Sequence, residues 1–199
     1  MKTAEQKVID VLKSNGGVAR TRDFLTGGVH PRDLYKMRDA GQIVCIARGL
    51  YQIPGQPPDA PDIATICKKI PNGVLCLISA LSLHQITTEI PRAVHIALKR
   101  GAAKPQLNYP PVATYWMSEA AFEAGVERMN IEGLDVPVYC AEKTLADCFK
   151  YRNKIGMDTV LEALRLYRER FRFDGNKLMH YAKICRVDNI MRPYLEASL

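Results

Sequence analysis

The sequence lacks the segments that would direct it into or across a membrane. No apolar run approaches the roughly 20 residues needed to cross a bilayer, and the longest apolar stretch, residues 73–83, is interrupted by Ser79 and Ser82. The chain begins Met1 to Gln6 without the apolar core of a signal peptide. We therefore expect a cytoplasmic protein with no membrane partner.

Sequence signatures of common cofactor, metal and catalytic sites are also missing. The six cysteines form no CxxC pair and no Cys/His cluster with zinc-ligand spacing, so we expect reduced, mostly buried thiols. The chain contains no GxxxxGK[ST], GxGxxG, HExxH or GxSxG segment. We expect no cofactor, no metal site and no catalytic residue.

One group of charged residues raises the alternative of a metal-dependent nuclease. Glu142 and Lys143 lie near Asp135 and Asp147 in the sequence. Adjacent residues point to opposite faces of a strand, and they diverge by about 100° on a helix. Lys143 and Asp147 are four residues apart, which is the spacing of an ion pair within a helix. We favour the ion pair and keep a nuclease domain guided by a DNA-binding domain as the enzyme alternative.

The net charge of +7 is concentrated near the two ends of the chain. Residues 1–56 carry nine Lys/Arg against five Asp/Glu, and residues 143–192 carry twelve against six. Residues 57–142 carry seven against nine. Basic ends attract polyanions such as DNA, but charge alone supports only non-specific binding, and a solvated surface explains it equally well.

Three helices are predicted before residue 41, over residues 4–14, 21–26 and 31–40. The first begins with a capping box, Thr3 to Gln6, and the third has a proline in its first turn, where no amide proton is needed. In the short second helix we expect Phe24 and Leu25 to face inward. In the third, Leu34 and Met37 are expected in the core.

A hairpin follows these helices. The segments 42–46 and 50–53 are rich in β-formers, and they flank a turn with Arg48 at its tip. Three helices with a short middle one, then a hairpin, is the order of a winged helix-turn-helix domain. We place this domain at residues 1–56.

The predicted third helix has a polar face suited to the major groove of DNA. Arg32, Tyr35 and Lys36 lie opposite the apolar positions and offer long hydrogen-bond donors. An ordinary solvated face has the same pattern, and the hairpin that follows is what favours DNA binding. We predict base reading by Arg32 and Tyr35. The full predicted DNA-binding set is Arg20, Arg22, His30, Arg32, Tyr35, Lys36 and Arg48.

A proline-rich connector over residues 55–61 separates the first domain from a second, residues 57–199. Helices are predicted there over residues 62–70, 75–86, 118–124, 141–151, 159–170, 175–185 and 190–195. Strands are predicted over 93–98, 112–117, 129–131 and 136–140. The expected inward positions of the two longest late helices are Leu145, Cys148, Phe149, Val160, Leu161, Leu164 and Tyr167. The fold class is therefore α+β: an N-terminal winged helix-turn-helix, then a mixed α+β domain with a helical C-terminus.

Several of these stretches resemble AbiEi-type antitoxins, the repressing antitoxins of bacterial abortive-infection toxin–antitoxin systems. In the first domain they are Gly17 to Leu25, Gly28 to Leu34, Gly41 to Val44 and the phrase Arg48-Gly-Leu-Tyr-Gln-Ile-Pro54. In the second they are Ser79 to Pro91 and Glu142 to Gly156. Together the similar stretches span most of residues 17–170.

The resemblance implies two tasks in phage defence. The first domain would bind inverted repeats in its own promoter as double-stranded DNA and repress transcription. The second would counteract a cognate AbiEii-type nucleotidyltransferase toxin, by direct contact or indirectly. The basic residues Lys150, Arg152 and Lys154 are predicted to bind a partner, although the polar end of a helix before Gly156 explains them equally well. A stand-alone transcriptional regulator without a toxin is the other alternative.

Overall fold

The chain forms two compact units in the computed structural model, which describes residues 2–55, 61–107, 109–131 and 134–196. The first unit comprises Met1–Pro71 with Met129–Val136, and the second comprises Asn72–Arg128 with Pro137–Leu199. The boundary expected after residue 56 thus falls inside the first unit, because the helix that follows the connector packs against the first strand. Most of the connector, residues 56–60, lies outside the described residues.

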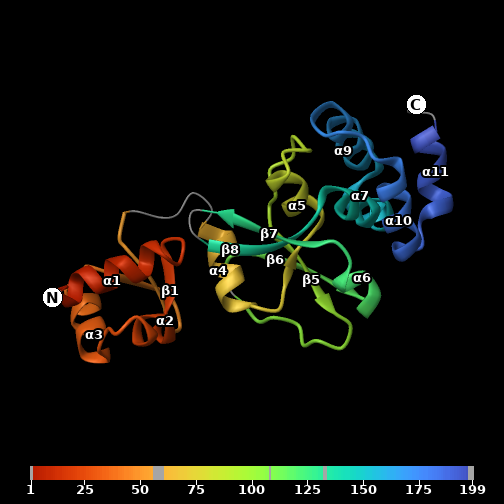
Figure 1. Cartoon of the computed structure of the whole chain (residues 1–199). Helices are drawn as coiled ribbons and strands as arrows, with labels where there is room; N and C mark the ends of the chain where they lie inside the picture. Colours follow the sequence, from red (N-terminus) through yellow and green to blue (C-terminus); the bar gives the residue numbers. More distant parts are fainter. Residues whose placement is uncertain (1, 56–60, 108, 132–133, 197–199) are drawn as a thin grey trace. The chain divides into compact units, whose positions relative to one another are not determined.

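Apart from the segment Met129–Val136, the described residues of the first unit form four helices and a three-stranded antiparallel sheet (Figure 1). Its helices are α1 (Ala4–Lys13), α2 (Thr21–Thr26), α3 (Pro31–Asp39) and α4 (Pro61–Lys69). Its strands are β1 (Val18–Arg20), β2 (Val44–Ala47) and β3 (Leu50–Gln52), in the order β1-β3-β2. The three predicted helices and the hairpin are present, and the α+β class with an N-terminal winged helix-turn-helix is confirmed.

Local signals explain most of these elements. The Thr3 hydroxyl accepts a hydrogen bond from the Gln6 amide at 3.2 Å, so the N-cap is present. The Gln6 side chain donates to Asp10 instead of reaching back to Thr3, so only half of the predicted capping box forms. The helices enclose a core of apolar residues: Val8, Val11, Leu12, Ala19, Phe24, Val29, Leu34, Met37, Ile43 and Tyr51.

Two expectations about this unit were wrong or incomplete. Leu25 was expected inward but is 45% exposed, because α2 is less than two turns long and Phe24 alone fills the position against Tyr51, with ring centroids 6.0 Å apart. Strand β1 was not predicted. It is only three residues long, and its partners, Gln52 for Val18 and Leu50 for Arg20, lie more than 25 positions away.

The second unit combines a mixed sheet with helices. The strands of its sheet are β4 (Val74–Leu75), β5 (Val94–Lys99), β6 (Val112–Met117), β7 (Val126–Ile131) and β8 (Leu134–Tyr139), in the order β6-β5-β4-β8-β7. Residues 129–131 of β7 and 134–136 of β8 are grouped with the first unit. The helices are α5 (Leu77–Leu83), α6 (Glu119–Glu123), α7 (Ala141–Lys150), α8 (Arg152–Ile155), α9 (Met157–Arg170), α10 (Gly175–Cys185) and α11 (Asp188–Glu196). Strand β4 runs antiparallel to β5 and parallel to β8, and β5 runs parallel to β6.

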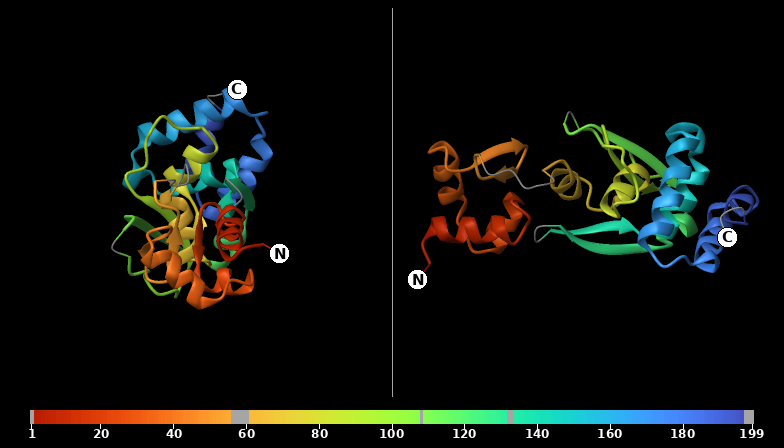
Figure 2. Two further views of the ribbon diagram at one scale, coloured as in Figure 1. Left: turned by 90° about the vertical axis from the view of Figure 1, so that its left-hand side faces the viewer. Right: turned by 90° about the horizontal axis from the view of Figure 1, so that it is seen from above.

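Helix α7 is the most enclosed element of this unit. Helices α5, α9, α10 and α11 all pack against it, as Figures 1 and 2 show. Every residue from Ala141 to Phe149 is consequently buried, including the three predicted inward positions. The helical C-terminus expected from the sequence is therefore part of the packed core and not an appendage.

Three details differ from the predicted elements of this unit. The helix expected over residues 75–86 is instead β4 followed by α5, because the Cys76 amide donates to the carbonyl of His95 on β5. Leu161 was expected inward and is 39% exposed, since α9 packs through Val160 and Leu164. The short helix α8 was not predicted. Residues 132 and 133 of the predicted turn lie outside the described residues. Among the helices that the structure describes, none is long and apolar enough to span a bilayer.

Candidate nucleic-acid interface

Helix α3 is anchored so that one face stays in solvent. Its N-cap is His30, whose Nδ1 accepts a hydrogen bond from the Arg32 amide at 3.2 Å, and Pro31 occupies the first turn. Leu34 and Met37 are buried, as predicted. The opposite face is therefore free to present its side chains.

The exposed face of α3 carries the residues predicted to enter the major groove. Arg32, Tyr35 and Lys36 are all exposed, and Tyr35 retains 42% of its surface. Sequence reasoning missed Arg38, whose guanidinium lies 5.0 Å from the centre of the Tyr35 ring. Arg38 is held there by Asp39 at 2.7 Å. The three-residue spacing of Tyr35 and Arg38 was the available signal, and the contact limits the movement of the tyrosine ring.

The turn between β2 and β3 presents Arg48, which is exposed. The next residue, Gly49, has a φ of +66°, and an added Cβ would lie 3.2 Å from the Thr21 hydroxyl. Its carbonyl accepts a hydrogen bond from the Thr21 amide at 3.0 Å. This hydrogen bond ties the turn to the start of α2. A turn held in one position is suited to phosphate contacts, which set the orientation of a protein on DNA.

Arg20 and Arg22 lie where β1 passes into α2. Arg20 is half-buried, pairs with Leu50 across the sheet, and donates its amide to Asp23 at 2.8 Å. Arg22 is exposed, with its Nε 3.6 Å from the same carboxylate. The structure thus groups Arg20 and Arg22 near the wing, and it groups Arg32, Tyr35 and Lys36 on α3.

Residues 6–54 match the family model described as "Transcriptional regulator, AbiEi antitoxin". This confirms, for that segment, the resemblance to AbiEi antitoxins that the sequence indicated. The match includes all seven residues predicted to bind DNA and ends before α4 begins.

A comparison with solved structures finds the same fold over most of the chain. The crystal structure of the RV2827C protein from Mycobacterium tuberculosis aligns with a TM-score of 0.51 and 12% sequence identity, covering 95% of this chain and 79% of that one. At that identity the likeness concerns the fold alone. No curated protein matches the chain.

The predicted partner-binding residues of the second unit lie beside a group of aromatic rings. The ammonium of Lys154 is 5.7 Å from the ring centre of Tyr151 and 5.8 Å from that of Tyr115, and Lys150 lies 6.0 Å from Tyr151. Arg152 is half-buried and donates to the carbonyl of Phe149 at 2.9 Å, which satisfies the end of α7. Lys150 and Lys154 are exposed and able to meet an acidic partner.

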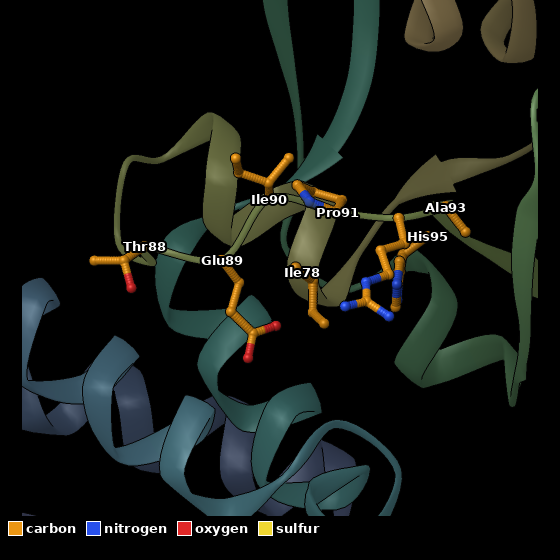
Figure 3. Close-up of a pocket in the computed structure, with 8 residues that line it drawn as sticks. Ile78, Thr88, Glu89, Ile90, Pro91, Ala93 and His95 are labelled. Atoms are coloured by element: carbon orange, nitrogen blue, oxygen red, sulfur yellow. The ribbon is translucent and has the colours of Figure 1, made fainter.

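A pocket of about 890 Å³ lies close to these rings, lined by Ile78, Thr88, Glu89, Ile90, Pro91, Arg92, Ala93 and His95. Glu89 and Ile90 point in opposite directions from the chain in Figure 3, and Ile90 is 90% exposed. His95 stacks on Tyr115 and shares a 3.2 Å hydrogen bond with its hydroxyl. Burial lowers the pKa of His95, while the charge of Glu89 opposes that change.

The loop that lines the pocket is fastened to α9. The Glu162 carboxylate accepts hydrogen bonds from Thr87 and Thr88, and Thr159 donates to Glu89 at 2.7 Å. The hydrogen bonds with Thr88 hold the pKa of Glu162 below its ordinary value. Sequence reasoning singled out the Ser79 to Pro91 stretch as a resemblance but named no site residue in it.

Three of the four charged residues considered for a nuclease, Glu142, Lys143 and Asp147, take part in two separate ion pairs. Lys143 Nζ lies 2.5 Å from Asp147 Oδ2 in the interior, so the predicted ion pair within a helix is confirmed. Glu142 pairs with Lys177 at 3.0 Å and accepts a hydrogen bond from the Tyr167 hydroxyl at 3.0 Å. Within the described ranges, no three His, Cys, Asp or Glu residues are grouped so as to hold a metal ion.

Proposed function

We propose that this protein is a DNA-binding transcriptional autorepressor and the antitoxin of a nucleotidyltransferase toxin, acting in the cytoplasm. The observation that carries the DNA-binding half is the exposed polar face of α3, followed in the chain by an arginine-tipped wing, inside the segment that matches the AbiEi model. Its ligand would be double-stranded DNA with inverted repeats upstream of its own gene.

The two groups of side chains suit two kinds of DNA contact. Arg32 and Tyr35 would read base edges in the major groove, because a guanidinium binds guanine with two hydrogen bonds and a phenol hydroxyl both donates and accepts. Arg20, Arg22, Lys36 and Arg48 would neutralise phosphates. His30 contributes mainly by capping α3 and so fixing the direction of Arg32.

Substitutions at the two groups should have different consequences for binding. Arg32→Ala should cost about 1–3 kcal/mol of binding free energy for the operator and relax the sequence preference at one base position. Arg48→Ala should weaken binding to all sequences. It should also lower the salt slope, which is the slope of log affinity against log salt concentration, by about one. The measurement is a fluorescence-anisotropy titration of operator and scrambled duplexes at several salt concentrations. If Arg32→Ala and Tyr35→Phe both leave the preference for the operator unchanged, the groove assignment is wrong.

The antitoxin half rests on the matched family and on the second unit as a separate folded body. Lys150 and Lys154 are the candidate contacts, and the partner would present acidic side chains to them. Inspection of the neighbouring gene for a nucleotidyltransferase frame, followed by co-expression with that enzyme, tests this half. If cells that make the toxin survive only when this protein is also made, the result supports an antitoxin. If the toxicity is unchanged, the result supports a stand-alone regulator.

A further inference from the structure

Helix α4 belongs to the DNA-binding unit although it follows the connector. It packs against β1, and Ala64, Thr65 and Ile66 are buried. It lies outside the segment that matches the family model and outside the three helices and hairpin predicted from the sequence. Its last two residues, Lys68 and Lys69, contact two different parts of the winged helix.

Lys68 joins the end of α1 to the start of α2. Its ammonium donates to the side-chain oxygen of Asn15 and lies 3.5 Å from an oxygen of Asp23. The side chains of Lys68 and Asp23 are only 15% and 19% exposed. The same Asp23 oxygen accepts a hydrogen bond from the amide of Arg20, the N-cap residue of α2. Lys68 therefore supports the carboxylate that caps this helix.

Lys69 contacts the wing. Its ammonium donates to the main-chain carbonyl of Arg48 at 2.8 Å. The carbonyl of the neighbouring Gly49 accepts the amide of Thr21 at 3.0 Å. Two consecutive carbonyls of the wing turn are therefore held from two sides, one by α4 and one by α2.

We propose that α4 is a brace of the DNA-binding unit and that Lys69 is a positioning residue for the wing. A hairpin of four and three residues is marginal by itself, and Gly49 gives its turn wide conformational freedom. Fixing the Arg48 carbonyl fixes the backbone from which the Arg48 side chain leaves, so less ordering is left to the moment of binding. The inference rests on the proposed DNA-binding function, and it extends the functional unit to residue 71.

The effect on DNA is tested with the full-length protein and a duplex from the region upstream of its gene. Lys69→Met should lower affinity about threefold to tenfold, the value of one hydrogen bond, with the salt slope unchanged. Lys69→Arg should restore affinity, since its guanidinium can also donate to the carbonyl. Lys13→Met, which removes the same charge from an exposed position at the end of α1, is the matched control. An affinity equal to that of the control, or a salt slope lowered by about one as for a phosphate contact, would overturn the proposal.

A second measurement tests the brace without DNA. Exchange of the Thr21 amide proton, which is bonded to Gly49, should become several-fold faster in Lys69→Met than in the wild type, because the wing turn loses one of its two fixed carbonyls. The rate should be unchanged in Lys13→Met. Equal exchange in Lys69→Met and wild type contradicts the positioning role. Failure of the wild type to bind the duplex would defeat the proposed function alone, and the exchange rates would still decide the role of Lys69.

Discussion

Lys143 and Asp147 form a charged pair that is fully removed from water. The ammonium also lies 4.1 Å from the ring centre of Tyr139, and Cys185 Sγ lies 3.2 Å from the second carboxylate oxygen. Burial raises the pKa of Asp147, and the charge of Lys143 opposes that increase. Such a pair adds little net stability compared with apolar residues, but either partner left alone is a costly buried charge.

We therefore expect Lys143→Met to destabilise the protein by about 3–5 kcal/mol at neutral pH. A carboxyl whose pKa is raised by folding favours the folded state at low pH and loses that contribution as pH rises through the folded value. The penalty of Lys143→Met should accordingly shrink on acidification, as Asp147 takes up a proton. Urea unfolding at pH 7.5 and pH 5 measures both values.

The double variant Lys143→Met with Asp147→Leu is the control for this experiment. It removes both charges and leaves an apolar pair of similar volume, so it should recover much of the lost stability. A penalty that is equal at the two pH values would show that lost packing, and not the unpaired carboxylate, causes the destabilisation.

Among the secondary-structure elements, those with strong local signals were predicted best. The helices Thr21–Thr26 and Gly175–Cys185 and the strand Val112–Met117 have the bounds that the sequence indicated. Strands β1 and β4 were missed, because they are three and two residues long and their pairing partners are distant in sequence. Periodicity needs more residues than these strands contain.

The same distinction applies to the candidate interface. The polar face of α3 and the arginine at the wing tip follow from spacing within a helix and from a turn, which are local patterns. The bond from Lys69 to Arg48 joins residues 21 positions apart, so no local pattern reveals it. The Ser79 to Pro91 stretch could be recognised, but its position beside His95 and α9 depends on the fold of the second unit.

His30 offers a test of how α3 is built. Because its Nδ1 accepts the Arg32 amide, His30→Ala should cost about 0.5–2 kcal/mol of stability and weaken operator binding through a frayed first turn. His30→Asn should retain both, since asparagine is a strong N-cap residue. Thermal unfolding and operator titration of the two variants measure the effects. Loss of operator binding in His30→Asn at wild-type stability would instead indicate that the imidazole contacts DNA.

Over the whole molecule, the basic charge at the two ends of the chain falls in two different units. The seven predicted DNA-binding residues are all in the first unit, and Lys150 and Lys154 are in the second. The domain bounds predicted from the sequence, residues 1–56 and 57–199, assign DNA binding to one part of the chain and the antitoxin role to the other. That assignment stays a prediction. A protein that uses its units for separate partners should tolerate loss of one activity without loss of the other.

We expect charge reversal to separate the two activities. Lys150→Glu with Lys154→Glu should abolish rescue from the toxin because the acidic partner is repelled, while operator affinity and its salt slope stay as in the wild type. Arg32→Ala with Arg48→Ala should abolish repression of a promoter–reporter fusion and leave rescue intact when both proteins are made from an unrelated promoter. Both lysines are exposed on the surface of the second unit, so the fold should survive their replacement. If the double glutamate variant loses operator affinity as well, Lys150 and Lys154 face DNA, and the second unit takes part in repression.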